Sequence, residues 1–300
     1  MAQRLTSLEI TKDEIEEIDN YEQNGFIFAK ECGKVSSAVA RDIKGTLELK
    51  YTPSVIKFNL AGGKGLLMLS SFLPKRKVQL RSGQIHFNTD RLTLEVIKIS
   101  KRKRAYLNKQ SILLLSSMGI YPGVFQNLID DMINCYLMGA TSKDNLLNDL
   151  MDEYYSSYFT NSFKRLVFSG FLERQDPFIM NLIISFQNKV LKQLKDEYKL
   201  YIRNGARAFA IMDETGSLEQ GEVFFQTSTS AGINTVCEII EGPCVIFRDS
   251  SLSPGNVVLA TAVNKPKLKN HTNVLIYSAY ELMDLPGKCS NDDADEDNFT

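Results

Sequence analysis

The sequence predicts an α+β protein in which two β-rich regions are separated by a helical block. Short runs of alternating apolar and polar residues occur before residue 104 and return after residue 205, whereas apolar residues between them follow helical spacing. The chain has 300 residues, of which 43% are hydrophobic and 24% charged, so it can bury a large core. We therefore predict a polar N-terminal segment (1–24), a first β lobe (25–104), a helical connector (105–204) and a second β lobe (205–300).

The first β lobe is predicted from three alternating runs and one amphipathic segment. Glycines at positions 62, 63 and 65 interrupt the pattern between two strands. Upstream, Thr11 and the acidic residues that follow it predict the cap of a short helix through Ile15 and Ile18. The expected strands are 47–51, 55–58 and 92–97, and a helix is expected near 36–43.

The helical connector and the second β lobe have equally plain signals. Four or five helices are expected, two of them starting at Pro122-Gly123 and at Asp176-Pro177. The apolar spacing that predicts helices covers 111–115, 124–133, 178–186 and 190–194. The strands expected in the second β lobe are 208–212, 223–226, 244–247, 257–262 and 274–277.

Composition excludes several classes of function. The net charge of −1 gives no global preference for nucleic acid, so any basic surface must be local. Five cysteines without CxxC spacing argue against a disulfide framework and a zinc site, and they fit a reducing intracellular compartment, nuclear or cytoplasmic. Only two histidines are present, which disfavours a histidine-based triad. No apolar run reaches 18 residues, so we expect a soluble protein without a membrane partner.

An acidic stretch near the C-terminus is the first candidate site. Five of the six residues from Asp292 to Asp297 are acidic, and Asp293, Asp295 and Asp297 alternate. On an extended segment such side chains share one side, where hard carboxylate oxygens suit Mg²⁺ or Ca²⁺. A solvated acidic tail is the alternative. An EF-hand is excluded because its sixth position would be Asn298 rather than glycine.

Local basic clusters are the second group of candidates. One is Lys75-Arg76-Lys77 with Arg81, and another runs from Lys98 to Arg104. Such clusters either neutralise a phosphate chain or form solvated loops. Lys64 lies within a glycine loop that is either an anion-binding nest or a plain hairpin turn, and the spacing is not that of a P-loop. Asp213-Glu214 is read as part of a β-turn in preference to an acid/base pair.

Six short motifs follow one another along the chain. They are Gly33-Lys34-Val35-Ser36; Gly62-Gly63-Lys64-Gly65; Ala105-Tyr106-Leu107-Asn108-Lys109-Gln110 with the following Leu-Leu-Leu-Ser-Ser-Met-Gly; Arg207 with Asp213-Glu214-Thr215-Gly216, Leu218, Gly221 and Val223-Phe224; Arg248 with Leu252-Ser253-Pro254-Gly255-Asn256 and Ala262-Val263; and Cys289-Ser290 followed by Asn291 to Asp297. Each motif alone is weak. Together, and in this order, they resemble the eukaryotic, cell-encoded RNA-dependent RNA polymerases of RNA silencing, from about Gly25 to Phe299.

The resemblance implies both a fold and a chemistry. It implies two double-psi β-barrel lobes, as in multisubunit RNA polymerases, and an RNA-directed RNA polymerase that copies a single-stranded RNA template from NTPs. It implies that Asp293, Asp295 and Asp297 are catalytic and hold Mg²⁺, and that Lys64 and Arg248 bind the nucleotide triphosphate. Silencing-pathway proteins are implied as partners. The basic residues expected to contact RNA are Arg81, Lys101, Arg102, Lys103, Arg104 and Lys109.

The sequence also departs from the family pattern. Glu296 stands where the catalytic loop of the family has glycine, and Asn291-Asp292 replaces Gly-Gly. A non-glycine residue at a position that needs positive φ costs about 1 kcal/mol or more. Ala61 replaces another glycine, Asn59 an arginine and Asn256 an aspartate. These changes predict a partial or divergent member, and the alternative function is that of a catalytically inactive, truncated paralogue that binds RNA or acts as a scaffold.

Overall fold

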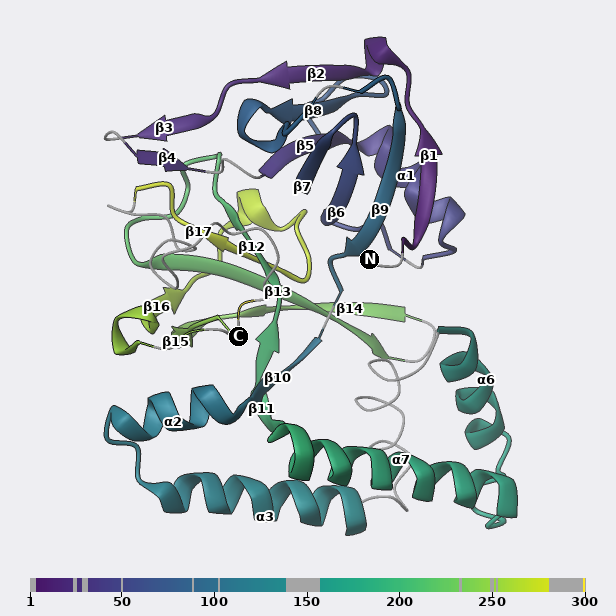
Figure 1. Ribbon diagram of the computed structural model, residues 1–300. Coiled ribbons are helices and arrows are strands. Elements are labelled where there is room, and N and C mark those ends of the chain that lie inside the picture. Colours follow the sequence, from purple (N-terminus) through teal and green to yellow (C-terminus); the bar gives the residue numbers. More distant parts are fainter. Residues whose placement is uncertain are drawn as a thin grey trace. The chain divides into compact units, whose positions relative to one another are not determined.

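The computed structural model (Figure 1) describes most of the chain and divides it into two compact units. Unit 1 comprises residues 1–102, 207–248 and 255–300, and unit 2 comprises residues 103–206 and 249–254. The described residues are all except 1–3, 24–25, 29–31, 50, 88, 102, 139–156, 232–233, 249–250, 252, 281–298 and 300. The α+β class is confirmed, and the four-segment division proposed from sequence stays a prediction.

The first part of unit 1 is a mixed seven-stranded sheet with the order β1-β9-β6-β7-β5-β8-β2. Strands β5 and β7 pair in parallel, as do β2 and β8, and the other neighbours are antiparallel. Helix α1 (Ser37–Thr46) packs against this sheet, and Ser36 caps the helix by accepting a hydrogen bond from Val39 N. The strands are β1 (Thr6–Glu9), β2 (Ile15–Ile18), β5 (Cys32–Ser36), β6 (Val55–Leu60), β7 (Gly63–Ser70), β8 (Val78–Arg81) and β9 (Thr93–Ile99).

The helix expected through Ile15 and Ile18 is wrong. A capping box between Thr11 and Glu14 is present, but it starts only one turn of 3-10 helix, Lys12–Glu14. The chain then extends as β2 and pairs in parallel with β8. The cap residues therefore acted as expected locally, and pairing with a distant strand decided the residues after them.

The strand expected over 47–51 is also wrong. Leu47 and Glu48 end helix α1, and Glu48 has the left-handed φ of 51° that often follows a helix C-terminus. Leu47 N and Leu49 N donate to the carbonyl oxygens of Ile43 and Lys44. Both leucines are half-buried against the core of the seven-stranded sheet, so their alternation reflects a helix end rather than a strand.

The second part of unit 1 is a six-stranded sheet in which β14 pairs with β13 beside the path β12-β17-β13-β16-β15. All five strands expected from sequence in this region are confirmed, and β14 is an additional one. A buried cluster combines Val55 and Leu66 of the first sheet with Phe209, Phe224 and Ile276 of the second. The two sheets of unit 1 therefore share an apolar core. The strands are β12 (Phe209–Met212), β13 (Glu222–Ala231), β14 (Asn234–Ile240), β15 (Gly242–Ile246), β16 (Val258–Ala262) and β17 (Val274–Tyr277).

Smaller elements complete unit 1. A short hairpin of β3 (Tyr21–Gln23) and β4 (Phe26–Phe28) precedes β5. Single turns of 3-10 helix cover Ser82–Gln84 and Pro266–Leu268, and another, Pro254–Asn256, begins at the last residue of unit 2 and ends in unit 1.

Unit 2 contains four described helices and a two-stranded sheet. Pro122 and Pro177 stand at helix starts, as predicted, and Asp176 caps α7 by accepting from Phe178 N and Ile179 N. Within the described part of the chain, no helix is long and apolar enough to cross a membrane. The elements are β10 (Lys103–Leu107), α2 (Lys109–Ser117), α3 (Pro122–Met138), α6 (Ser157–Phe168), α7 (Pro177–Glu197) and β11 (Leu200–Arg207).

Candidate functional site

The glycine loop of the sequence is the turn of a tight hairpin between β6 and β7. Leu60 pairs with Gly63, so the loop consists of Ala61 and Gly62 alone, with φ values of 51° and 79°. Two successive positive φ angles define the type I′ turn that matches the twist of antiparallel strands. The plain-hairpin alternative thus describes this backbone, which we call the glycine hairpin. It explains why glycine suits the position of Ala61.

Lys64 is the first exposed residue after this turn. It lies opposite Asn59 on β6, and Asn59 lies opposite Glu95 on β9. Residues directly opposite each other point to the same face of a sheet, so these three polar side chains form one row. The neighbouring residue Leu60 points the other way into the core and is only 2% exposed.

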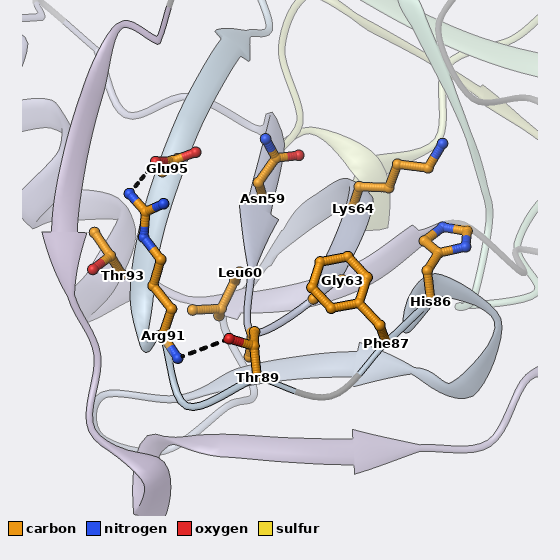
Figure 2. Close-up of a pocket in the computed structure, with 12 residues that line it drawn as sticks. Asn59, Leu60, Gly63, Lys64, His86, Phe87, Thr89, Arg91, Thr93 and Glu95 are labelled. Atoms are coloured by element: carbon orange, nitrogen blue, oxygen red, sulfur yellow. Dashed lines mark hydrogen bonds and ion pairs between the residues drawn. The ribbon is translucent and has the colours of Figure 1, made fainter.

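A pocket of about 660 Å³ lies over this row. Figure 2 shows that the segment after the 3-10 turn at Ser82–Gln84 forms another wall, with the Phe87 ring between Thr89 and His86 in this view. Sequence reasoning missed these wall residues, because a lone aromatic in a polar loop carries no periodic signal. The lining residues are Asn59, Leu60, Ala61, Gly62, Gly63, Lys64, His86, Phe87, Thr89, Arg91, Thr93 and Glu95.

Charges in the pocket are unevenly balanced. Glu95 accepts from the Arg91 guanidinium at 2.8 Å and faces Arg4 at 3.6 Å. Its single negative charge therefore already has two cationic neighbours, while Lys64 adds a third cation on the adjacent strands. Two cationic side chains, Lys64 and Arg91, thus line the pocket with one carboxylate, and positive charge suits an anionic ligand.

Arg81, predicted to contact RNA, is buried and only 4% exposed. Its guanidinium donates to the carbonyl oxygens of Cys32 and Asp19 at 2.8 Å each and to Glu214 Oε1 at 2.6 Å. Lys34, from the first of the six motifs, also pairs with Glu214 at 2.5 Å. All three guanidinium nitrogens of Arg81 thus have protein acceptors, and its RNA contact stays a prediction.

The charged side chains of Glu214, Arg81 and Lys34 also lie near Cys32. Burial, with the negative charge of Glu214 nearby, raises the pKa of the Cys32 thiol to about 12, even though Arg81 and Lys34 work in the opposite direction. This cysteine is therefore a neutral thiol at physiological pH and not a nucleophile.

The Asp213 side chain organises the turn after β12. It accepts hydrogen bonds from the backbone N–H groups of Thr215, Ser217 and Leu218, and from the hydroxyls of Thr215 and Ser217. Burial works to raise the pKa of Asp213, but these donors outweigh it and the pKa is lowered. The geometry is that of a β-turn held by an aspartate, which agrees with the preferred interpretation from sequence.

Arg248 follows β15 and is 4% exposed. It forms a β-bridge with Phe299, and its guanidinium carbon lies 5.8 Å from the centre of the Phe299 ring. Phe299 also exchanges backbone hydrogen bonds with Ala208, at 2.9 and 3.0 Å. The three predicted metal ligands Asp293, Asp295 and Asp297 lie outside the described residues.

Two of the predicted RNA-contacting residues, Arg104 and Lys109, lie beside aromatic rings. Arg104 lies 5.5 Å from the Tyr201 ring centre, and Lys109 lies 5.6 Å from that of Tyr198. Lys103 is half-buried on β10, Lys101 is exposed just before that strand, and Arg102 lies outside the described residues. Of the predicted residues, the structure thus brings Arg104 and Lys109 to two neighbouring tyrosines, as cation–π contacts.

A metal site must be sought outside these clusters. Among the residues that the structure describes, no group of three or more His, Cys, Asp or Glu side chains could hold a metal ion. The alternating carboxylates of the acidic motif are by their chemistry a fitting donor set for Mg²⁺, because all three supply hard oxygen ligands.

Comparisons with known proteins agree on one class. The family described as "RNA dependent RNA polymerase" matches residues 2–300. RNA-dependent RNA polymerase 1 of Schizosaccharomyces pombe is 32% identical over 312 residues, covering 94% of this chain and 25% of that protein. RNA-dependent RNA polymerase 1 of Arabidopsis thaliana is 29% identical over 299 residues, covering 97% of this chain and 26% of that protein.

A solved structure shows the same fold. The RNA dependent RNA polymerase QDE-1 from Thielavia terrestris superimposes with a TM-score of 0.77 at 19% identity, covering 100% of this chain and 36% of that one. The fold is thus one that occurs in an RNA-dependent RNA polymerase. This chain belongs to the RNA-dependent RNA polymerase family. It spans about a quarter of the length of the fission yeast and Arabidopsis relatives.

Proposed function

We propose that this chain forms part of the catalytic core of an RNA-directed RNA polymerase, which copies single-stranded RNA from NTPs in RNA-mediated gene silencing. The observation that carries the proposal is the match of the family to residues 2–300, which includes all six motifs in order. The two sheets of unit 1 would correspond to the two double-psi β-barrels. The site of action would be intracellular, in the nucleus or the cytoplasm, with silencing-pathway proteins as partners.

The acidic motif would carry the catalytic metal. We assign Mg²⁺ to Asp293, Asp295 and Asp297, and the bound ion would lower the pKa of the attacking 3′-hydroxyl and neutralise charge on the leaving pyrophosphate. Phe299, two positions after Asp297, is anchored to Ala208 and Arg248.

Cationic side chains would hold the substrates. Arg248 and Lys64 are assigned to the triphosphate, where positive charge stabilises the developing negative charge of the reaction. The exposed position of Lys64 at the rim of a pocket lined by two cationic side chains supports this assignment. Lys101, Arg102, Lys103, Arg104 and Lys109 are assigned to the RNA backbone, which predicts that RNA binding weakens as salt rises.

The metal assignment is tested by Asp295→Asn. Loss of one carboxylate should abolish RNA synthesis on a single-stranded template and lower Mg²⁺ affinity in a calorimetric titration at least tenfold. Asp90→Asn, an exposed acidic residue elsewhere in the chain, is the matched control and should change neither reading. Equal RNA synthesis and equal Mg²⁺ affinity in Asp295→Asn and the unmodified chain would refute the assignment.

A second function, a catalytically inactive RNA-binding or scaffold protein, is favoured by one observation. Glu296 and Asn291-Asp292 replace family glycines beside the proposed metal ligands. If these substitutions weaken the metal loop, Glu296→Gly should raise both Mg²⁺ affinity and RNA synthesis. Unchanged Mg²⁺ affinity after this substitution would count against loop strain as the cause of an inactive chain.

A further inference from the structure

The wall of the pocket beside the glycine hairpin carries an exposed aromatic ring on a fixed backbone. His86 N donates to Gly62 O at 3.1 Å, and Ile85 forms a β-bridge with Gly63. Gly62 also lies very close to Phe87: a Cβ atom added to Gly62 would be only 1.7 Å from Phe87 O. The backbone at Phe87 is therefore pressed against the hairpin, while 65% of the residue remains exposed.

An exposed phenylalanine alone indicates little, because isolated apolar residues are common on protein surfaces. Phe72, on the turn after β7, is 92% exposed and belongs to no described pocket. Phe87 differs because its ring borders a pocket that also contains Lys64 and Arg91 (Figure 2). A flat apolar surface beside cations is the combination that binds a base and its phosphate.

The polar side chains around the ring add to this match. Asn59 and Thr89 are exposed and line the same pocket, so they can hydrogen-bond to the edge of a base. Glu95 is already paired with Arg91 and lies close to Arg4, which limits its repulsion of a phosphate. The residues that line this one pocket thus include a ring for stacking, groups that form hydrogen bonds, and cations.

We propose that the pocket of the glycine hairpin is a binding site for one unpaired base of an RNA strand, with Phe87 as the stacking platform. Arg91, which lines the same pocket, contacts the phosphate beside that base. An unpaired base is required, because both faces of a base inside a duplex are already stacked on its neighbours. The proposal deepens the proposed function, since it states how that function would hold its single-stranded substrate.

The ligand is a strand rather than a free nucleotide for an energetic reason. Base–aromatic stacking contributes roughly 1–3 kcal/mol per base, whereas even a millimolar dissociation constant requires about 4 kcal/mol. The exposed ring therefore adds usefully to a strand that is bound along several phosphates. It is too weak to retain a base by itself.

The test measures RNA binding and not synthesis, so it is independent of the metal loop. A labelled 12-nucleotide single-stranded RNA is titrated with the full chain and followed by fluorescence anisotropy at fixed salt. Phe87→Ala should weaken binding about 5- to 150-fold, the range that corresponds to the stacking energy. Phe87→Tyr keeps the ring and should stay within about twofold of the unmodified chain.

Controls separate stacking from loss of structure. Phe72→Ala removes a more exposed ring outside the pocket and should leave the affinity unchanged. Thermal unfolding of Phe87→Ala checks that the hairpin remains folded, and a blunt RNA duplex of the same length should bind both proteins equally. Arg91→Ala should reduce the salt dependence of single-strand binding.

Several results would overturn the proposal. They are unchanged single-strand affinity in Phe87→Ala, an equal loss of duplex binding, or absence of single-strand binding by the unmodified chain. Saturation of the pocket by millimolar UTP in a Phe87-dependent manner would show that it binds free nucleotides instead. A chain that synthesises no RNA but shows the Phe87 effect would contradict the polymerase proposal and support this one.

Discussion

Two glycine-containing turns of unit 1 have similar backbones and very different surroundings. Gly62 in the first sheet has a φ of 79°, and Gly221 before β13 in the second has a φ of 77°. A Cβ atom on Gly62 would collide with Phe87, whereas one on Gly221 would meet nothing within 4 Å. The first glycine is thus required by packing as well as by its φ angle, and the second by its φ angle alone.

The charged residues near these two regions differ in the same way. Lys64 beside the first turn is exposed, whereas Asp213, near the start of the second region, is 1% exposed and holds its own turn through five hydrogen bonds. The Lys64 side chain is thus accessible to a ligand, whereas the hydrogen bonds of the Asp213 carboxylate hold its own turn together.

The largest expected effect is at Arg81, which links the two sheets through Glu214. Arg81→Ala leaves three acceptors without their donor and should lower the free energy of unfolding by about 3 kcal/mol or more. Lys64 is exposed, so Lys64→Ala should change the free energy of unfolding by less than about 0.5 kcal/mol. Urea unfolding of both variants measures the difference. Similar losses in the two would mean that burial does not separate these cations.

The two glycines allow the next comparison. Gly62→Ala should lower the free energy of unfolding by roughly 2–4 kcal/mol, because strain at positive φ and the collision with Phe87 O act together. Gly221→Ala should cost about 1 kcal/mol, since only the φ strain applies. Thermal unfolding of the two variants gives the ratio, and equal costs would show that the hairpin yields to the added methyl group.

The effect expected at Asp213 is smaller than those at Arg81 and Gly62, and it depends on pH. Asp213→Asn should lower the free energy of unfolding by about 1–3 kcal/mol at pH 7, because an amide nitrogen then faces backbone donors. The folded pKa of Asp213 is lowered, so its stabilisation is complete above the unfolded pKa of about 3.9 and is lost as pH falls through the folded value. The difference between variant and unmodified chain should therefore shrink as the pH falls below about 4. A constant difference would contradict this role of the carboxylate.

Much of the fold followed from local patterns. The alternation in β6, β9 and all five expected strands of the second region, and the proline-marked starts of α3 and α7, were predicted correctly. Two segments were predicted wrongly. Ile15–Ile18 is a strand rather than a helix, and 47–51 contains the end of helix α1 rather than a strand. Pairing with the distant strand β8 decided the first segment. The end of α1 and packing against the core of the seven-stranded sheet decided the second.

For the candidate site, too, some features were predictable from the sequence and others depended on the tertiary structure. The sequence by itself determined the class of protein, because six ordered motifs and three alternating aspartates survive as residue types at fixed spacing. It also identified Lys64 and its glycines. Only the tertiary structure decided that Arg81 is buried against Glu214, and that Phe87 and Arg91 lie in one pocket with Lys64. Spacing along a chain records local conformation and shared motifs, whereas burial and the meeting of distant side chains depend on strand order and register, which no single segment encodes.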